Sequence, residues 1–553
     1  MKKLGLKIPR LPLILFFVFF FCKPSLAANC YIRAGATGSN SGSSWANAWT
    51  TFGAVTWTRG NTYYVAGGTY NEDVTITAAE AGTNWIIIKK ANAGDNSGDP
   101  GWDSSFAAAQ AVVNGKFVIY NGYFEMDGVT GSGLAGHGIK ISVISSASVL
   151  AFSSGASPRH LHHLDLQGPG FDYGSAGTDG IYYNSTAANS KGLYISYCWI
   201  HEIPRNGVTV GNVVGTDYIN YGMLFENNVL GRTGGVAIAY PGIHGQGMQI
   251  AYSQADAYVI IRNNIFYNIY SQGPISYLGL GTHSNSRIYN NVFYSTDPAA
   301  YSSASAIYMH NLSVSVADIY VYNNTFYNLG GYASHIRNDF AGAPNIEVKN
   351  NLWVSCPFGQ RHTNITAAAN NDYYNNYGVN IPAGETNQKT ETADPFINSA
   401  GYDLHLKPGA NARDSGIDLS GIFTTDKDGV TRPPGFWDIG AYEYGGSITP
   451  PPPPPPDTGS SIFNNTKTYP SPYKLEAGKT LKIIELPLNA NVKIYNMNGV
   501  LIKELKETDF NNAGYVEWDG KDNNNDPVAR GIYYYVASDE KGNKKTGKFT
   551  VLK

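Results

Sequence analysis

The sequence predicts an all-β solenoid, in which coils of parallel strands stack on one another. A pair of asparagines recurs within apolar strands, and a second strand marker accompanies each pair. The first asparagines lie 36, 27, 33, 27 and 25 residues apart, an interval typical of stacked supersecondary units and unlike a helical heptad. The pairs are Asn227-Asn228, Asn263-Asn264, Asn290-Asn291, Asn323-Asn324, Asn350-Asn351 and, as a weaker copy, Asn375-Asn376.

The second marker is a small residue followed by an aliphatic residue, a variable residue and often another aliphatic residue. From its aliphatic residue to the first asparagine of the next pair is 19, 15, 15, 16 and 14 residues. Two strands that repeat together at a nearly fixed separation make one coil. The markers are residues 207–210, 247–250, 274–277, 306–309 and 335–337.

The asparagines are predicted to build the fold and to do no chemistry. In stacked coils each residue lies about 4.8 Å from its counterpart one rung away. An inward-facing Asn can donate its amide hydrogens to the Asn oxygen of the next rung and so continue a ladder. Asn also tolerates the left-handed backbone that a tight bend requires.

The first residues resemble an export signal. Met1-Lys2-Lys3 and Arg10 precede an apolar run over 11–22, and small residues follow at 25–27, which predicts a signal peptide over 1–28. The run is short for a membrane span, and no later stretch is apolar enough, so no transmembrane segment is expected. Cys30, Cys198 and Cys356 then remain, a sparse and odd set that argues against a disulfide framework.

Composition narrows the class of partner. Charged residues make up 15% of the chain and the net charge is -3, so neither nucleic-acid binding nor a basic membrane-binding face is expected. The 40 tyrosines and 62 glycines are typical of a β-rich extracellular protein with a polar, uncharged surface, which suits sugars.

Residues from about 29 to 60 are predicted to cap the first coil. The spacing of apolar residues from Trp45 to Val55 predicts one short helix over the open end of that coil. Strands are expected at 63–70, 85–88, 117–119 and 123–128, each bounded by turn residues.

Residues 29–446 resemble secreted bacterial right-handed parallel β-helix proteins of the pectate-lyase-like superfamily. The resemblance implies a right-handed parallel β-helix whose substrate lies along an outer sheet. Because that superfamily holds lyases, epimerases and hydrolases, it implies the fold more firmly than an activity. It rests on the opening segments 31–35 (YIRAG), 42–45 (GSSW) and 65–70 (VAGGTY), and on the closing segments 393–396 (ADPF), 403–409 (DLHLKPG), 426–429 (DKDG), 432–433 (RP) and 438–444 (DIGAYEY).

A linker over 447–461 precedes a second domain. Its seven prolines at 450–456 predict a stiff polyproline II spacer. Residues 462–553 are Lys-rich with short alternating strands, which predicts a small β-sandwich. This region resembles the immunoglobulin-like module of flagellar hook-capping proteins and of the C-termini of secreted bacterial proteins. The resemblance implies recognition by a secretion system and surface display, and a plain accessory domain is the alternative.

The search for catalytic residues starts from the chemistry of polyuronate lyases. These enzymes need a base for the proton α to a carboxylate and a cation for the enolate charge. Residues at the coil markers share one face, and strand alternation sends Gln249 outward. The predicted catalytic residues are His244, Tyr252, Arg205, Arg337 and His310, and the predicted substrate-binding residues are Gln246, Gln249, Tyr182 and Asp179. Bound Ca²⁺ is an alternative to arginine as the cation, and no other cofactor is predicted.

Two further patterns are similar to functional motifs. The run 160–165 (HLHHLD) has metal-ligating residue types, but adjacent histidines alternate faces in a strand, so a metal site is not predicted there. Gly136-His137-Gly138 and Thr178-Asp179-Gly180 are similar to pieces of the polygalacturonase signature, but their order is reversed and no Asp-Asp pair lies between them. The carboxylate pair of an inverting hydrolase is therefore not identified.

The sequence favours a secreted or surface-displayed protein that acts on polysaccharides. The first hypothesis is a lyase or epimerase for uronate-containing glycans, with Tyr252 or His244 as the base and Arg205, Arg337 or Ca²⁺ as the cation. The competing hypothesis is a non-catalytic surface protein that binds glycans or acts as an adhesive stalk.

Overall fold

The computed structural model describes most of the chain from residue 27 to residue 552. It describes residues 27–552 except 131–135, 146, 154–156, 172, 174–176, 185–191, 212–221, 241, 252–257, 279–281, 299–304, 311–314, 331–333, 341, 357–359, 375–383, 446–465, 470–471, 476–478, 485, 487–489, 498–499, 507–514 and 539–543. The predicted signal peptide up to residue 26, the linker 447–461 and the weaker Asn375-Asn376 copy lie outside the described residues.

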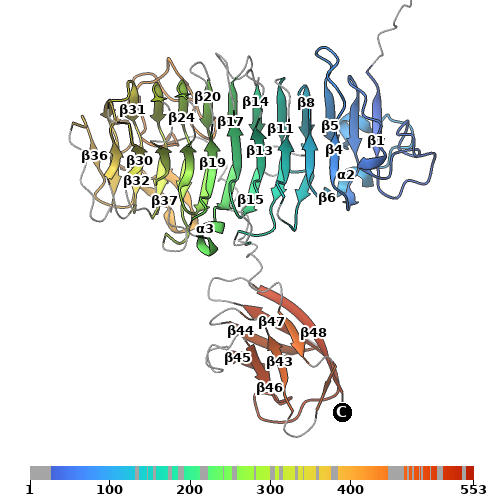
Figure 1. The fold of residues 1–553 in the computed structure, drawn as a ribbon. Helices are drawn as coiled ribbons and strands as arrows, with labels where there is room; N and C mark the ends of the chain where they lie inside the picture. The colour runs from blue at the N-terminus through green and yellow to red at the C-terminus, as the bar shows by residue number, and fades with distance from the viewer. Residues whose placement is uncertain are drawn as a thin grey trace, which may run out of the picture.

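The first part of the chain is a right-handed parallel β-helix, as predicted. The coils contribute strands to three sheets, and within each sheet the strands of successive coils pair in parallel. The coils follow one another along the long axis from β1 to β36 (Figure 1).

Sheets A and B hold twelve strands each. Sheet A contains β1 Asn29–Ile32, β2 Thr62–Val65, β5 Ile86–Lys90, β8 Phe124–Asp127, β11 Arg159–His162, β14 Leu193–Ser196, β17 Met223–Glu226, β20 Val259–Arg262, β24 Ser286–Tyr289, β28 Ile319–Tyr322, β31 Ile346–Lys349 and β34 Ala367–Ala369. Sheet B contains β3 Gly68–Tyr70, β6 Ala111–Asn114, β9 Ile139–Ser142, β12 Leu164–Gln167, β15 Trp199–Ile203, β18 Val229–Thr233, β21 Ile265–Ile269, β25 Val292–Tyr294, β29 Thr325–Tyr327, β32 Leu352–Val354, β35 Asp372–Tyr374 and β36 Lys389–Thr390.

Sheet C holds ten strands and contains the markers that were read from the sequence. Its strands are β4 Val74–Ile76, β7 Phe117–Ile119, β10 Leu150–Phe152, β13 Ile181–Asn184, β16 Val208–Gly211, β19 Gln246–Ile250, β22 Gly273–Tyr277, β26 Ile307–Met309, β30 Ser334–Asn338 and β33 Gln360–Thr363. Each coil therefore runs from sheet A through the asparagine bend to sheet B, and then to sheet C.

The two asparagines of a pair divide the two predicted roles between them. The second residue forms the ladder: Asn264 donates from its backbone N and its Nδ2 to Oδ1 of Asn291, at 3.0 and 2.9 Å, and Asn291 does the same to Asn324 at 2.9 and 3.0 Å. The ladder continues without a break from Asn228 to Asn371. The column that the solenoid requires is therefore present.

The first residue of each pair provides the bend. Asn263, Asn290 and Asn323 have φ values of 59, 54 and 48°, the left-handed region that Asn tolerates. Among the described residues, the last pair in the ladder is Asn370-Asn371, which lies between β34 and β35. At the other end of the ladder stands Cys198, whose backbone N donates to Asn228 Oδ1 at 2.9 Å.

The core is a continuous apolar column inside the coils. Inward residues of all three sheets are buried together. Four aromatic rings stack along the column at centroid distances of 5.0, 4.9 and 4.9 Å, from Phe266 through Phe293 and Phe326 to Trp353. Cys30, Cys198 and Cys356 are buried in this core.

The N-terminal cap differs from the prediction. The segment from Trp45 to Val55 contains only the 3-10 helix Phe52–Ala54. Trp49 instead forms a parallel bridge with Ile32, because its N–H and C=O bond to Tyr31 and Arg33 at 3.0 and 2.8 Å. Trp49 therefore pairs like a strand residue along the edge of the first coil. The short helices α1 Ala93–Asn96 and α2 Ser105–Ala108 follow, and α3 Val236–Ala239 lies further along the chain.

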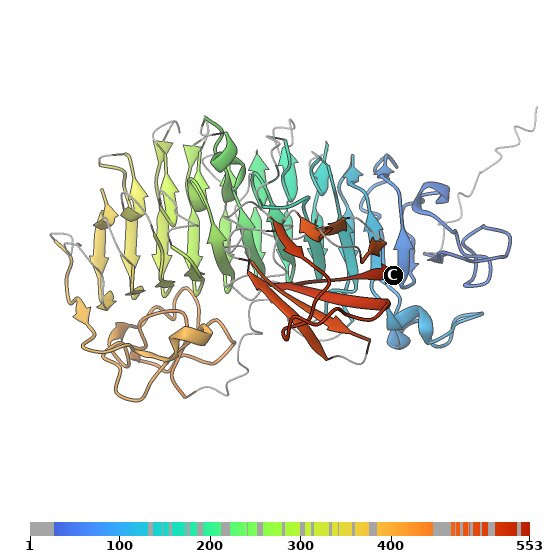
Figure 2. The same ribbon diagram turned by 90° about the horizontal axis from the view of Figure 1, so that it is seen from below.

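Residues 394–444, here named the C-terminal strap, fold back along the outside of the later coils. The strap is the orange segment beside the yellow and green coils in Figure 2. It contains β37 Phe396–Asn398, β38 Asp403–Leu406, β39 Gly416–Ile417, β40 Phe436–Trp437 and the 3-10 helix Ser399–Gly401, while β23 Thr282–His283 and β27 Ser315–Val316 form a small separate pair in the coils.

The strap covers the outer surfaces of two sheets. It packs apolar residues on sheet B around Tyr267, Tyr294 and Leu352, and it packs Phe423 and Trp437 on sheet A beside Tyr289. The first asparagines of several pairs hold it in place, because their Nδ2 atoms donate to strap carbonyls at 2.8 to 2.9 Å. The outer face of sheet C is not part of these contacts among the described residues.

Residues 466–552 form the predicted β-sandwich. One sheet contains β41 Lys467–Tyr469, β43 Leu481–Ile484 and β46 Tyr515–Trp518, and the other contains β42 Tyr473–Lys474, β44 Asn491–Asn496, β45 Leu501–Lys506, β47 Gly531–Ser538 and β48 Lys544–Leu552. Both sheets contribute to one core, with Trp518 and Tyr535 among its largest members. Among the described residues, no helix is long and apolar enough to span a membrane.

Candidate functional site on sheet C

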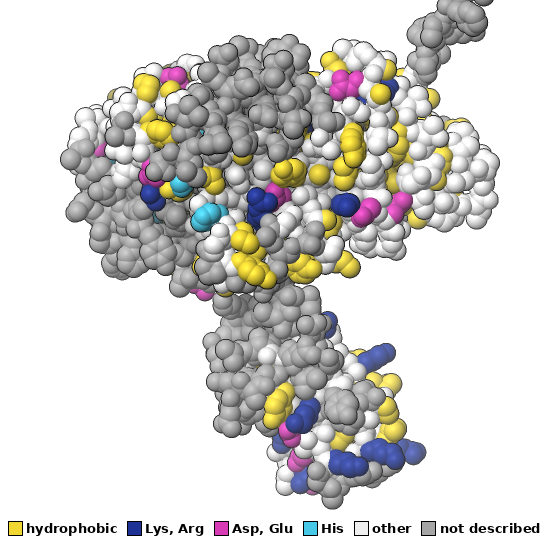
Figure 3. Space-filling model, in the orientation of Figure 1, with side chains coloured by type: hydrophobic (Ala, Val, Ile, Leu, Met, Phe, Trp, Pro, Cys, Tyr) yellow, Lys and Arg dark blue, Asp and Glu magenta, His cyan; other side chains and the backbone are white. Residues whose placement is uncertain are grey.

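The outer face of sheet C carries a column of polar side chains in register. In each strand, the residues on either side of the column member point into the core, as Val208 and Val210 do. The residue between them, here Thr209, therefore points outward. The column runs Tyr182, Thr209, Gln249, Ser276, Tyr308, Arg337 and Thr363. Histidine, basic and acidic side chains gather over the middle of this face, near β19 and β30 (Figure 3).

One cluster of charges lies at the β26 and β30 rungs. Arg337 donates from Nε and an Nη atom to the two carboxylate oxygens of Asp339, at 2.8 and 3.2 Å. The Tyr308 hydroxyl donates to Asp339 Oδ2 at 2.9 Å. The His310 ring lies 4.8 Å from the Tyr308 ring. A cation, an imidazole, a phenol and a carboxylate are thus held side by side by two adjacent coils.

The electrostatics of this cluster separate a base from an acid. Burial lowers the pKa of His310, and the neighbouring Arg337 and His244 act in the same direction, whereas Asp339 opposes the shift. His310 is therefore neutral at pH 7 and able to accept a proton. Burial and the bond to Asp339 raise the pKa of Tyr308 to about 12, so its phenol keeps its proton.

A second cluster lies about four rungs away, roughly 20 Å along the axis at about 4.8 Å per rung. Buried Asp179 accepts from the backbone N of Asn206 at 3.2 Å and from Thr209 Oγ1 at 2.9 Å. Arg205 lies near it, with Nε 3.9 Å from Asp179 Oδ1. Burial raises the pKa of Asp179, although Arg205, Thr209 and Asn206 oppose the shift.

The remaining predicted residues are divided between the surface and the interior. His244 is exposed, and Gln249 accepts from Asn206 Nδ2 at 2.9 Å in the outward column. Gln246 is buried and bonds to Gln272. Tyr182 stands at the end of the column beside Thr209, and Tyr252 lies outside the described residues.

The structure therefore brings His244, His310 and Arg337 into one neighbourhood, and Asp179 and Arg205 into another. Tyr308 and Asn206 were not predicted. Tyr308 could have been found, because it occupies the variable position of its marker, as Gln249 does in another. On this face, the carboxylates of Asp179 and Asp339 already bond to an arginine, a hydroxyl or a backbone amide. Either carboxylate alone supplies fewer oxygen ligands than the roughly six to eight that Ca²⁺ usually takes.

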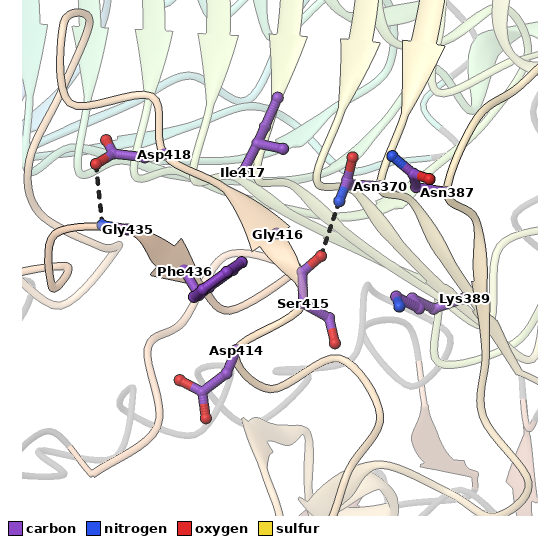
Figure 4. A pocket seen from close by; sticks show the side chains of 10 residues that line it. All are labelled: Asn370, Asn387, Lys389, Asp414, Ser415, Gly416, Ile417, Asp418, Gly435 and Phe436. Carbon is purple, nitrogen blue, oxygen red and sulfur yellow. Dashed lines mark hydrogen bonds between the residues drawn. The ribbon is translucent and has the colours of Figure 1, made fainter.

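A cavity elsewhere has neither histidine nor arginine among its lining residues. It has a volume of about 320 Å³ and lies between the last coils and the strap, where Lys389, Asp414 and Phe436 are among its lining residues (Figure 4). Asn370 and Asp418 on its wall bond to strap backbone atoms. It contains a single basic residue and no histidine, so sheet C remains the better candidate site.

Comparison with known proteins identifies several similar structures. PorZ, a surface component of the type-IX secretion system of Porphyromonas gingivalis, is 23% identical over 17% of this chain and 12% of its own, with a TM-score of 0.15. The pectate lyase Pel9A is 12% identical over 75% of this chain and 97% of its own, with a TM-score of 0.38. The tailspike gp49 of the Acinetobacter baumannii bacteriophage Fri1, a capsular polysaccharide depolymerase, is 12% identical over 85% and 73%, with a TM-score of 0.32.

These similarities are too distant to carry a functional argument, and the region similar to PorZ spans about an eighth of that protein. No protein-family model matches the sequence, and no curated protein is significantly similar to it. The assignment of the fold therefore rests on the strand pairing described above.

Proposed function

We propose that the outer face of sheet C binds a uronate-containing polysaccharide and cleaves it by β-elimination. The observation that carries this proposal is the grouping of His310, Arg337, Tyr308 and Asp339 on the face that the strap leaves uncovered. A lyase needs a neutral base and a fixed cation within reach of one sugar ring, and His310 and Arg337 supply them.

In this mechanism Arg337 binds the carboxylate of the uronate ring. Neutral His310 takes the proton α to that carboxylate, and Arg337 stabilises the enolate charge that forms. The electron pair moves to make the C4–C5 double bond as the C4–O bond breaks. The His310 imidazolium returns its proton to the leaving oxygen, so that the enzyme is restored. Asp339 and Tyr308 hold Arg337 in place through the bonds given above.

Arg205 has a different role from Arg337 because of the distance between their rungs. At roughly 20 Å, both arginines cannot act on the same ring. Arg205 therefore serves as a second carboxylate contact further along the polymer, with buried Asp179 setting its position.

The test is a panel of soluble polyuronates with absorbance of the unsaturated product as the readout. We expect the full chain to act on at least one polymer. His310→Ala and Arg337→Ala should lose about 100-fold or more in rate, the size typical of general base and charge stabilisation. Arg287→Ala, an arginine on sheet A, is the matched control and should retain the rate of the unchanged protein. No product on any polymer, with and without Ca²⁺, would overturn the lyase.

Non-catalytic glycan binding is the second candidate. It is favoured by the neutral character of the column from Tyr182 to Ser276 and by the pairing of Arg337 with Asp339. Binding of a polyuronate without turnover, weakened by Arg337→Ala and unchanged by Arg287→Ala, would support it.

We also propose export and surface display. Two features support this proposal. The sequence predicts a signal peptide over 1–28, and the C-terminal sandwich resembles an immunoglobulin-like sorting domain. Deletion of residues 462–553 should leave the β-helix folded but absent from the cell surface in a host that displays the full chain. Unchanged display after the deletion would contradict it.

A further inference from the structure

A separate group of metal-ligating side chains lies on the outer face of sheet A. Strand β11 pairs with β8 so that His160 stands opposite Glu125. His162 is two residues further along β11 and therefore shares the outward face with His160. One ligand atom from each of Glu125, His160 and His162 lies within 4.8 Å of the other two.

The adjacent histidine does not belong to this group. Neighbouring histidines alternate faces in a strand, and this holds for His162 and His163. His163 has a φ of 53°, so the chain turns there, and its ring stacks on Tyr197 at 4.9 Å. His160 and His162 are two positions apart, with only Leu161 between them, and therefore share a face, and Glu125 joins them from the preceding coil.

The surroundings of the two histidines restrict their orientation. Ser196 Oγ lies 2.7 Å from His162 Nδ1, and a bond from Nδ1–H to this hydroxyl leaves Nε2 free to ligate, as is usual for metal-bound histidines. The Trp85 and Tyr194 rings flank His160 at 4.7 and 5.6 Å. The His160 and Glu125 side chains remain 33% and 27% exposed, so an ion can enter from solvent.

We propose that Glu125, His160 and His162 bind a zinc ion on the outer face of sheet A. Two imidazoles and one carboxylate are a donor set that Zn²⁺ takes, with water in the remaining position. Imidazole ligands favour Zn²⁺ over Ca²⁺, which prefers oxygen ligands. The ion would join the β8 and β11 coils, and the site is independent of the activity proposed for sheet C.

The test is titration of the untagged full chain with ZnCl₂ by calorimetry, with metal analysis after dialysis. We expect one Zn²⁺ per chain at micromolar or tighter affinity, a rise in melting temperature on binding, and no comparable heat with CaCl₂. Loss of an outer-shell partner alone costs about 10- to 100-fold in metal affinity. Ser196→Ala should fall in that range, and His160→Gln, His162→Gln and Glu125→Gln should each lose at least as much.

His163→Asn is the matched control, because Asn tolerates the left-handed backbone at that residue. It should bind Zn²⁺ as the unchanged protein does. Melting temperatures without metal should agree among all variants, which shows that the outward substitutions leave the fold intact. The proposal is overturned if the unchanged protein does not bind Zn²⁺, if His160→Gln binds it equally well, if His163→Asn loses as much as His160→Gln, or if Ca²⁺ binds as tightly as Zn²⁺.

Discussion

The guanidinium of Arg337 lies over the ring of Tyr308, 4.5 Å from its centre, and both side chains donate to Asp339. Because the two residues occupy the same register position on adjacent rungs, the stacking of coils places a cation on an aromatic face. Arg337 is thus held in one orientation while its side chain stays 32% exposed.

The charge of Asp339 competes with an anionic substrate for Arg337. We expect Asp339→Asn to tighten binding of an oligouronate about fivefold, since a unit charge about 4 Å away contributes about 1 kcal/mol in water. Calorimetric titration with a soluble oligouronate measures this. Asp318→Asn, which removes an exposed carboxylate bonded to Asn345, is the control and should have no effect. Weaker binding by Asp339→Asn would show that Asp339 matters more for positioning Arg337 than for competing with the ligand.

The asparagine ladder should be a major source of stability. Asn291→Ala removes bonds to Ile261, Tyr289 and Asn324 and leaves buried groups unsatisfied, at about 1–3 kcal/mol each. We expect a loss of about 2–4 kcal/mol in the free energy of unfolding of the β-helix, measured by denaturant titration. Asn263→Gly changes a bend residue and should cost less than about 1 kcal/mol, because Gly adopts positive φ freely. Equal losses would refute the division of roles.

The aromatic stack gives a second stability prediction. Phe293 is fully buried between Phe266 and Phe326, and Phe293→Ala should destabilise the protein by about 3–5 kcal/mol through the cavity it leaves. Phe293→Leu fills most of that volume and should cost considerably less. The denaturation midpoints of the two variants measure these losses of stability. Similar losses in both variants would mean that ring stacking contributes more than the filled volume.

Much of the fold was predictable because its determinants are local and periodic. Each asparagine pair marks one bend and each marker one strand, so the repeats predicted the stacked coils. They predicted two strands per coil, whereas the asparagine bend divides the first of these into a sheet A strand and a sheet B strand, which makes three. The prediction of a helix at 45–55 was wrong because the backbone of Trp49 forms hydrogen bonds with Tyr31 and Arg33 of the first coil, and local spacing does not show such bonds. The Glu125, His160 and His162 group could not be found from one strand, because Glu125 comes from the coil before. Tyr308 differs, because the variable position of its marker indicates that it points outward, and only its partners Arg337 and Asp339 come from the next rung.

The strap should make stability depend on pH through His405. Burial by itself lowers the pKa of His405, but bonds to Asp428 and Asp403, at 3.0 and 2.6 Å, raise it above its ordinary value. A group with a raised folded-state pKa stabilises the protein fully below its unfolded pKa, and that stabilisation is lost as the pH rises through the folded pKa. The melting temperature should therefore fall as the pH rises from the ordinary histidine pKa of about 6.5 through the raised folded-state value.

His405→Gln should flatten this dependence, whereas His244→Gln, an exposed histidine, should leave it unchanged. Glu443, whose pKa burial raises to about 7, and Asp372, whose pKa burial raises to about 8, titrate over the same window in every variant. The difference between the His405→Gln and unchanged profiles therefore isolates His405. Parallel profiles would contradict the assignment.

The uniform rungs of the asparagine ladder have a consequence for how such a protein can change in length. Every rung from Asn264 to Asn324 presents the same acceptor to the coil before it and the same donors to the coil after it. A complete coil could be duplicated or removed between two rungs without leaving a mismatched edge. The reach of the molecule along a polymer could thus be tuned in increments of about 4.8 Å, while the chemistry at any one rung stays as it is.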